Sequence, residues 1–137
     1  MLVHATTLDI ASLGVLILGA SGTGKSDLAL RLIADGALLV ADDQTSIDVR
    51  GGELWATSPA KIAGLIEARG VGIVPVAIKL GTRLVLAVEF AALPARMPEW
   101  RSWSLPGVAV GIPLIELSPF EASAPAKLRF ALSQPPA

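Results

Sequence analysis

The stretch from Gly19 to Ser26, GASGTGKS, constrains this chain more than any other, because it matches the whole pattern G-x-x-x-x-G-K-[ST]. The apolar, partly β-branched residues 14–18 precede it and predict a strand buried on both faces. Residues 28–33 follow it with an apolar helical face, and Gly36 suits a left-handed cap. This order of strand, glycine-rich turn and helix predicts a loop that binds phosphate with its backbone N–H groups and the helix N-terminus.

Each position of this loop has an expected role. The three glycines let the backbone curl inward, Lys25 reaches the β and γ phosphates, and Ser26 binds a magnesium ion. A glycine-rich turn that contains Lys-Ser by chance is disfavoured, because all eight positions and both flanking segments agree with the pattern. The predicted nucleotide-binding residues are Gly19, Ala20, Ser21, Gly22, Thr23, Gly24, Lys25 and Ser26.

Composition limits the classes of partner. The 137 residues predict one domain, 1–137, and the net charge of −1, from 11 basic and 12 acidic residues, argues against nucleic acid or an anionic membrane as partner. The absence of cysteine excludes disulfides and thiolate metal sites. No apolar run approaches the roughly 18 residues of a membrane span, and no signal-like segment opens the chain, so we expect a cytoplasmic protein. The 53% hydrophobic content favours oligomer interfaces.

An acidic pair follows the next predicted strand, residues 37–41. A strand, helix, strand crossover is right-handed and parallel, so Asp42 and Asp43 are predicted to lie beside the phosphate loop. Two aspartates after a strand can also simply begin a turn. Because successive side chains of a strand face opposite ways, we expect one of the two to point into the site, and the sequence does not decide which.

The remaining segments predict mainly strands and loops. A tight hairpin is expected over 46–50 and 53–56 around Gly51-Gly52, and a functional loop over 93–107. Further predicted elements are a short helix or turn at 59–62, a hairpin of buried strands at 76–80 and 84–90, a strand at 112–117 and a helix from about 121 to 132.

Two further features have two interpretations each. His4 is the only histidine, and a lone histidine in a strand is more often structural than catalytic. Glu67 and Arg69 share one face if 65–69 is extended. The residues alone favour a surface ion pair there, although the glycines that follow allow a ligand to approach closely.

Four stretches together resemble the catalytic domain of the HPr kinase/phosphorylase family, in the form that lacks the family's N-terminal domain. The resemblance covers nearly the whole chain, and its most specific part is the Glu-x-Arg-Gly-x-Gly-Ile element at 67–73. The four stretches are LVHAT at 2–6, GASGTGKS at 19–26, LVADD at 39–43 and IEARGVGI at 66–73.

The resemblance implies an α/β fold with a P-loop nucleotide-binding core, a mixed sheet and a phosphoenolpyruvate-carboxykinase-like architecture. It implies a protein-serine kinase that transfers phosphoryl from ATP, or in many members pyrophosphate, to a seryl hydroxyl of the phosphocarrier HPr or a paralogue. Mg²⁺ is the implied metal, the same site can run backwards by phosphorolysis, and the family is hexameric. Regulation of the carbohydrate phosphotransferase system is the implied context.

The resemblance also implies roles for single residues. The family's catalytic histidine falls on His4 and its loop lysine on Lys25, its magnesium ligands on Ser26 and Glu67, and the base that accepts the seryl proton on Asp43. Arg96 matches the family's mobile-loop arginine, with Arg101 as its competitor.

The chain departs from the family pattern at two places. Asp27 stands where the family usually has glutamate, and residues 118–123 stand near the place of a missing Pro-Gly-Arg-Asn element that is linked to phosphorolysis.

Two other functions remain compatible with the loop. A small-metabolite kinase would need a substrate lid, for which only 93–107 could serve. A nucleotide-binding regulatory module with little catalysis would be expected to carry an Asn-Lys-x-Asp guanine-reading element, and the sequence has none.

Overall fold

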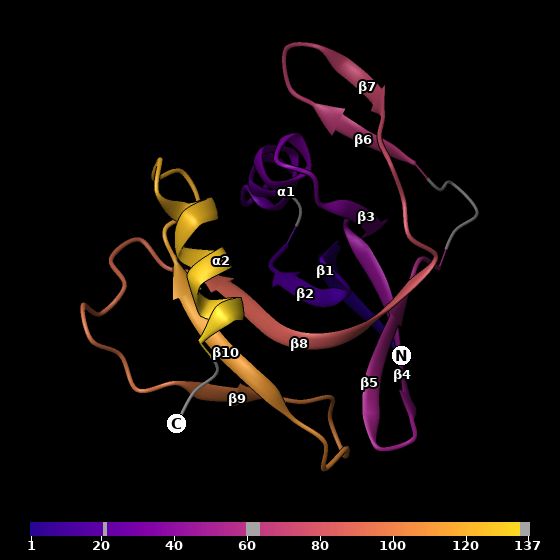
Figure 1. Ribbon diagram of the computed structural model, residues 1–137, viewed down its shortest axis with the longest axis vertical. Helices are drawn as coiled ribbons and strands as arrows, with labels where there is room; N and C mark the ends of the chain where they lie inside the picture. The colour runs from indigo at the N-terminus through magenta and orange to yellow at the C-terminus, as the bar shows by residue number, and fades with distance from the viewer. Residues whose placement is uncertain (21, 60–63, 135–137) are drawn as a thin grey trace.

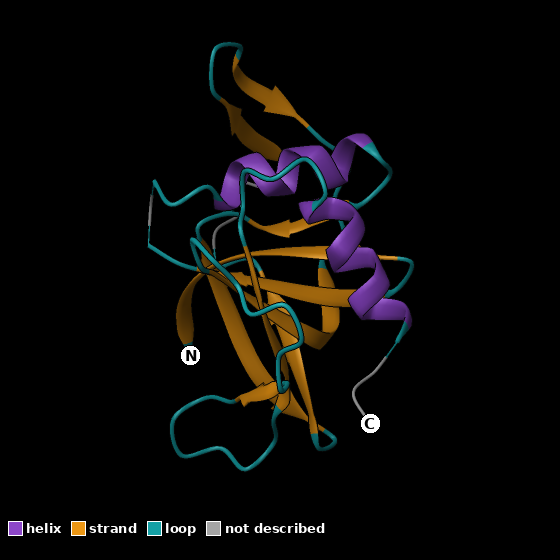
Figure 2. Cartoon of the chain, turned by 90° about the vertical axis from the view of Figure 1, so that its left-hand side faces the viewer, coloured by secondary structure: helices purple, strands orange, loops and turns teal. Residues whose placement is uncertain are grey.

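The computed structural model describes residues 1–20, 22–59 and 64–134 as a mixed sheet with two helices packed on it (Figures 1 and 2). A separate two-stranded hairpin, β6 and β7, projects beyond helix α1 (Figure 1). The strands are β1 (Leu2–Ile10), β2 (Leu13–Leu18), β3 (Leu38–Ala41), β4 (Gln44–Arg50), β5 (Glu53–Thr57), β6 (Leu65–Ala68), β7 (Gly72–Pro75), β8 (Gly81–Phe90), β9 (Arg101–Trp103) and β10 (Ile112–Leu117), and the helices are α1 (Lys25–Ala34) and α2 (Ala124–Ser133).

Two long strands, β1 and β8, connect the parts of the sheet. β1 pairs with β4 near its start and with β2 and β3 further along, always antiparallel. β8 pairs antiparallel with β5 at its start and then parallel with β2 and β10. Because β4 also pairs with β5, the strands β2, β1, β4, β5 and β8 close into a ring.

The closed ring and the helices bury two apolar cores. Leu16 of β2 points into a core with Ile47, Leu54 and Leu84, inside the ring of strands. Its neighbours Val15 and Ile17 point to the other face, where residues of α1 and α2 cover the sheet. The prediction of a strand buried on both faces is confirmed, because successive side chains of β2 enter different cores.

The crossover around the glycine-rich loop has the predicted form. β2 and β3 are both antiparallel to β1, so they run parallel to each other with α1 between them in sequence. Gly36, with φ of 107°, ends α1, and its N–H donates to Ile33 O at 2.9 Å. The hairpin of β4 and β5 is also confirmed, with positive φ at both Gly51 and Gly52, as a two-residue turn of type I′ requires.

The predicted hairpin of 76–80 with 84–90 is wrong. The segment 76–80 runs beside β3 instead: Leu39 N–H donates to Ala77 O, and Lys79 N–H donates to Leu39 O, each at 3.0 Å. The physical reason is a buried carboxylate, Asp9, which draws this segment to the β1–β2 turn. Asp9 is 3% exposed and accepts hydrogen bonds from Lys79 Nζ at 3.0 Å and Thr82 Oγ1 at 2.6 Å.

Other predicted boundaries moved. The loop predicted over 93–107 contains the short strand β9, which pairs with β10, and α2 begins at Ala124 rather than near residue 121. Of the turn predicted at 59–62, residues 60–62 lie outside the described part of the chain. Among the described residues, no helix is long and apolar enough to cross a membrane.

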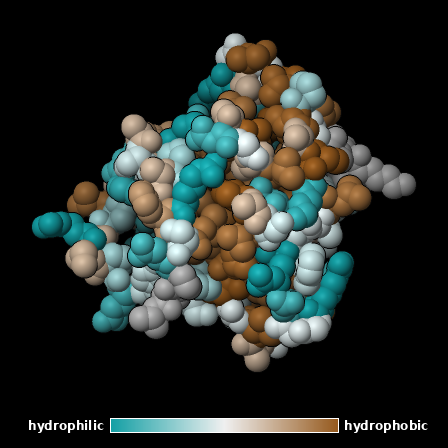
Figure 3. Space-filling view, viewed as in Figure 1, coloured by the Kyte–Doolittle hydropathy of each residue, from teal (hydrophilic) through white to brown (hydrophobic). Residues whose placement is uncertain are grey.

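The β6–β7 hairpin attaches through one face only. Ile66 is buried in the core beneath the helices, whereas Leu65, Val71 and Ile73 are exposed. Figure 3 shows apolar side chains at the upper right, where Figure 1 places this hairpin and the segment that follows it. The first residue of β6, Leu65, and the last residue of β3, Ala41, line the same cavity.

Candidate active site

The glycine-rich loop joins β2 to α1 with a backbone that only glycine adopts easily. Gly19, Gly22 and Gly24 have φ of 145°, 83° and 104°, and Gly24 is the N-cap of α1. A Cβ at Gly19 would lie 2.7 Å from Thr23 Oγ1, whose hydroxyl donates to Ala20 O at 2.7 Å. The loop is therefore a tight curl that leads into the positive end of a helix. Ser21, predicted to bind nucleotide, lies outside the described residues.

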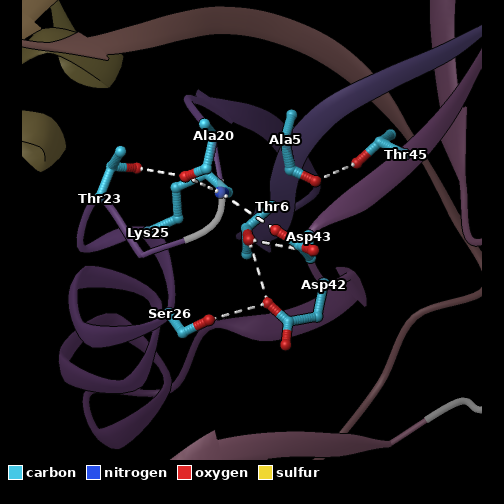
Figure 4. A network of polar contacts seen from close by, with 9 residues as sticks. All are labelled: Ala5, Thr6, Ala20, Thr23, Lys25, Ser26, Asp42, Asp43 and Thr45. Carbon is cyan, nitrogen blue, oxygen red and sulfur yellow. Dashed lines mark hydrogen bonds and ion pairs between the residues drawn. The ribbon is translucent and has the colours of Figure 1, made fainter.

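Lys25, the first residue of α1, folds back into this curl. It is 3% exposed, and its ammonium group donates to Ala20 O at 2.7 Å and forms an ion pair with Asp43 Oδ1 at 3.2 Å (Figure 4). The Lys25 ammonium group thus lies between the carbonyl oxygen of Ala20 in the loop and the carboxylate of Asp43, which follows β3. A phosphate bound to the loop would compete for this ammonium group.

The acidic pair lies beside the loop, as the crossover predicted. Ser26 Oγ donates to Asp42 Oδ1 at 3.1 Å, and Lys25 pairs with Asp43 (Figure 4). The expectation that only one of the two carboxylates points into the site is wrong. The reason is that Asp43 is not extended: its φ is 64°, so the chain turns at the end of β3 and both carboxylates contact the loop.

Asp42 and Asp43 form the turn between β3 and β4, the acidic corner of the site. Thr6 of β1, which sequence reasoning did not select, supports this corner. Its hydroxyl donates to Asp42 Oδ1 at 3.0 Å and accepts the backbone N–H of Asp43 at 3.1 Å. No local motif distinguishes a buried threonine of this kind from any other threonine in a strand. Only the pairing of β1 with β3 and β4 brings it to the corner.

His4 reaches the loop through its backbone. Its carbonyl accepts the N–H of Gly19 at 3.3 Å, and it pairs with Gln44, the residue after the acidic corner. The side chain is exposed. The structure thus brings His4, the beginning of the loop and the acidic corner to one edge of the sheet.

Glu67 is exposed on β6, on the face opposite the buried Ile66. Within the described part of the chain it forms no ion pair with Arg69, which lies in the turn after β6 and not in the strand. The beginning of the same strand is close to the acidic corner: Gly64 and Leu65 line a cavity of about 320 Å³ together with Asp42 and Asp43.

The two candidate loop arginines have different surroundings. Arg96 is exposed in the connection between β8 and β9. Arg101 lies on β9, where it forms ion pairs with Glu89 of β8 and, at 3.8 Å, with Glu116 of β10. The hydrogen bond with Glu89 raises the pKa of the Arg101 guanidinium above its ordinary value. Arg101 therefore links β9 to the neighbouring strands β8 and β10, whereas Arg96 is exposed in a connection between strands.

The stretch 118–123, near the place of the missing Pro-Gly-Arg-Asn element, packs against the loop. Arg31 of α1 donates to the carbonyl oxygens of Pro119 and, at 3.0 Å, Glu121. A Cβ at Gly24 would lie 2.9 Å from Phe120 Cζ, so the aromatic ring touches the loop where α1 begins. This contact gives a second reason for glycine at position 24.

The donors at the loop are of the type that a magnesium ion takes. The Ser26 hydroxyl and the Asp42 carboxylate are hard oxygen donors 3.1 Å apart. Among residues 1–20, 22–59 and 64–134, no group of three or more His, Cys, Asp or Glu side chains is arranged to hold a metal. Magnesium sites of nucleotide enzymes typically have few protein ligands, because phosphate oxygens and water supply the rest, so this donor set fits Mg²⁺ bound together with a nucleotide.

Comparison with known proteins identifies the family. The family model described as HPr Serine kinase C-terminal domain matches residues 1–103. The HPr kinase/phosphorylase of Clostridium kluyveri is 39% identical over 98 residues, which cover 72% of this chain and 32% of that protein. The enzyme of the same name from Brevibacillus brevis is 39% identical over 99 residues, with the same coverage.

A solved structure, the Hpr(Ser) kinase/phosphatase from Coxiella burnetii, is similar over 97% of this chain and 94% of its own, with a TM-score of 0.82 and 26% sequence identity. The α/β fold with a mixed sheet described above is therefore shared with the Coxiella burnetii protein. The chain spans 32% of the length of the curated relatives it matches. Its family model, its relatives and its fold agree, and the chain belongs to the HPr serine kinase C-terminal domain family.

Proposed function

We propose that this chain is an ATP-dependent protein-serine kinase that phosphorylates a seryl residue of the phosphocarrier HPr or a paralogue. One observation carries the proposal: Lys25 and Ser26 of the glycine-rich loop lie 3.2 and 3.1 Å from the carboxylates of Asp43 and Asp42. Phosphoryl transfer requires such positioned charges more than covalent chemistry. In this proposal the loop is a P-loop, and the architecture is of the phosphoenolpyruvate-carboxykinase-like kind.

The loop would hold the nucleotide. Its backbone N–H groups and the N-terminus of α1 bind the phosphates, and the Lys25 ammonium group exchanges its contact with Ala20 O for a phosphate oxygen. Ser26 would hold Mg²⁺, with Asp42 beside it. By the family resemblance, Glu67 of β6 would be a further ligand. The bound ion would neutralise charge on the phosphates.

Asp43 would act as the general base. The seryl oxygen attacks the γ-phosphorus, the bond to the β-phosphate oxygen breaks, and the seryl proton moves to the Asp43 carboxylate. Asp43 is 48% exposed, so an acceptor hydroxyl from another protein can reach it. His4, at the same edge of the sheet, and Arg96, from the loop after β8, would stabilise the negative charge of the transition state.

By the family resemblance, the same residues would also carry the reverse reaction. An oxygen of orthophosphate would attack the phosphorus of the seryl phosphate, and the bond between that phosphorus and the seryl oxygen would break. Asp43 would return its proton to the seryl oxygen, and pyrophosphate would be released. We include this phosphorolysis, and pyrophosphate as an alternative donor, in the proposal on the strength of the family. By the same resemblance we propose that the chain forms a homo-oligomer, a hexamer. Sedimentation equilibrium would measure the mass of this assembly.

The decisive experiment incubates the purified chain with ATP, Mg²⁺ and HPr and measures phosphoserine on HPr by mass spectrometry. The proposal expects a mass increase of one phosphate on HPr, and its absence with Lys25→Ala, which removes the ammonium group from the loop. Unmodified HPr under conditions in which ATP binds would overturn the protein-kinase assignment. Phosphate found only on a small molecule would favour the metabolite-kinase alternative.

A further inference from the structure

The corner between β3 and β4 is held in place by β1. β1 pairs with β4 through His4 and with β3 through Thr7, so Ala5 and Thr6 lie opposite the two aspartates. The N–H of Ala5 donates to the carbonyl of Asp43 at 3.1 Å. The position of the acidic pair therefore depends on β1 and not only on its own turn.

One hydroxyl of β1 contacts both aspartates. Thr6 is fully buried (0% exposed), donates to Asp42 Oδ1 at 3.0 Å and accepts the N–H of Asp43 at 3.1 Å (Figure 4). A hydroxyl has one proton to donate and lone pairs to accept with, so the two bonds are compatible. The same group thus orients the side chain of Asp42 and the backbone of Asp43.

The backbone of Asp43 requires this support. Its φ of 64° lies in the left-handed region, which costs a residue with a Cβ some energy and persists when surrounding bonds hold it. Both its N–H and its carbonyl are bonded to β1, and this conformation turns its carboxylate toward Lys25. In an extended conformation, successive side chains would face opposite ways.

We propose that Thr6 is a positioning residue of the active site, which sets turnover by holding Asp42 and Asp43 toward the loop without touching substrate itself. This inference rests on the proposed function for its kinetic part. Its structural part, that the Thr6 hydroxyl holds the corner, stands on the two hydrogen bonds alone. Groups that orient site ligands from behind typically affect activity by about 10- to 100-fold.

The chain offers a matched control. Thr7, the next residue of β1, is also fully buried, but its hydroxyl bonds Thr45 Oγ1 at 2.8 Å, which in turn donates to Ala5 O. Thr7→Val therefore removes a buried hydroxyl of the same strand that contacts neither aspartate. Thr6→Val removes the positioning hydroxyl at nearly constant volume, Thr6→Ser keeps it, and Thr6→Ala provides a second deletion without the valine methyl.

The test has two independent readouts. The first is amide hydrogen exchange of Asp43 by NMR, which we expect to be about tenfold faster in Thr6→Val and Thr6→Ala, and unchanged in Thr6→Ser and Thr7→Val. The second is the rate of phosphoryl transfer to HPr at saturating ATP. We expect a loss of about 10-fold or more in Thr6→Val, with the KM for ATP within about threefold of wild type, and near-normal rates in Thr6→Ser and Thr7→Val.

Each outcome decides the matter. Equal losses in Thr6→Val and Thr7→Val, or no recovery in Thr6→Ser, would reduce Thr6 to a packing residue and overturn the proposal. Faster exchange at Asp43 with wild-type transfer would also overturn it, because the corner would then move without consequence. Absence of transfer in the wild-type chain would refute the proposed function instead, and the exchange rates would still decide whether Thr6 holds the corner.

Discussion

Replacing Asp43 by asparagine separates a chemical role of this carboxylate from a structural one. The substitution keeps the size of the side chain, and asparagine is among the residues that tolerate the left-handed conformation, so φ of 64° needs no adjustment. The amide oxygen can still accept a hydrogen bond from Lys25. What is lost is the negative charge and the ability to take a proton.

The structure indicates two very different magnitudes for these losses. The Lys25–Asp43 ion pair spans 3.2 Å, and Asp43 is 48% exposed whereas Lys25 is 3% exposed. Because the ammonium group keeps its hydrogen bond to Ala20 O and can still donate to the asparagine amide oxygen, loss of the charge is expected to lower the free energy of unfolding by about 1 kcal/mol. Loss of positioned proton transfer lowers the rate by about 10²- to 10⁴-fold. That factor corresponds to about 2.7 to 5.4 kcal/mol of transition-state stabilisation.

Three measurements test this prediction. Urea denaturation measures stability, calorimetry measures binding of ATP with Mg²⁺, and quenched-flow mass spectrometry measures phosphate transfer to HPr. For Asp43→Asn we expect near-normal stability and binding with transfer reduced by at least 10²-fold. Asp42→Asn should mainly weaken the apparent affinity for Mg²⁺, because Asp42 contacts Ser26, the proposed magnesium ligand.

The control is Asp48→Asn on β4, an exposed aspartate that pairs with Arg50, and it should change none of the three quantities. Wild-type transfer by Asp43→Asn would refute the role of Asp43 as base. An exchange of phenotypes between Asp42→Asn and Asp43→Asn would keep the mechanism and swap the two carboxylates.

Three further predictions concern the proposed metal ligand Glu67, the proposed loop arginine Arg96 and the buried carboxylate of Asp9. Glu67→Gln should weaken the apparent Mg²⁺ affinity without loss of stability, because the side chain is exposed and an amide is a poor ligand for a hard cation; a magnesium titration equal to that of the wild type would leave Glu67 as a surface residue. Arg96→Ala should lower kcat much more than it weakens ATP binding, whereas Arg101→Ala should mainly loosen β9, because Arg101 pairs with strands; the reverse pattern would exchange their roles. For Asp9, burial raises the pKa, but hydrogen bonds from Thr82, Lys79 and the Ser12 N–H outweigh it, so the pKa is lowered. The stability that this carboxylate contributes is therefore present above its unfolded pKa of about 3.9 and lost as the pH falls through the lower folded value. Denaturant titrations should show that Asp9→Asn is less stable at pH 7 by about 2 to 4 kcal/mol and less dependent on pH below about 4, and equal pH profiles for both proteins would contradict this.

Local sequence was sufficient for the elements around the loop. Alternating side chains of β2, the apolar face of α1, the cap at Gly36 and the turn at Gly51-Gly52 are all determined within a few residues of chain. The parallel crossover is nearly as local, because strand and helix handedness leave one way to pack it. The approach of the acidic pair to the loop was therefore predictable.

Long-range contacts decided the rest. The segment 76–80 has the pattern of a hairpin strand. It lies beside β3 instead, where Lys79 bonds to the buried carboxylate of Asp9, 70 positions earlier, and no periodicity in the sequence encodes that contact. Likewise, strand alternation predicted that one aspartate would face the loop. The sequence alone determined that a glycine-rich loop and two carboxylates would meet. Only the tertiary structure, through the hydroxyl of Thr6 and the left-handed backbone of Asp43, decided that both carboxylates point into the site, because hydrogen bonds across the sheet override the local alternation of a strand.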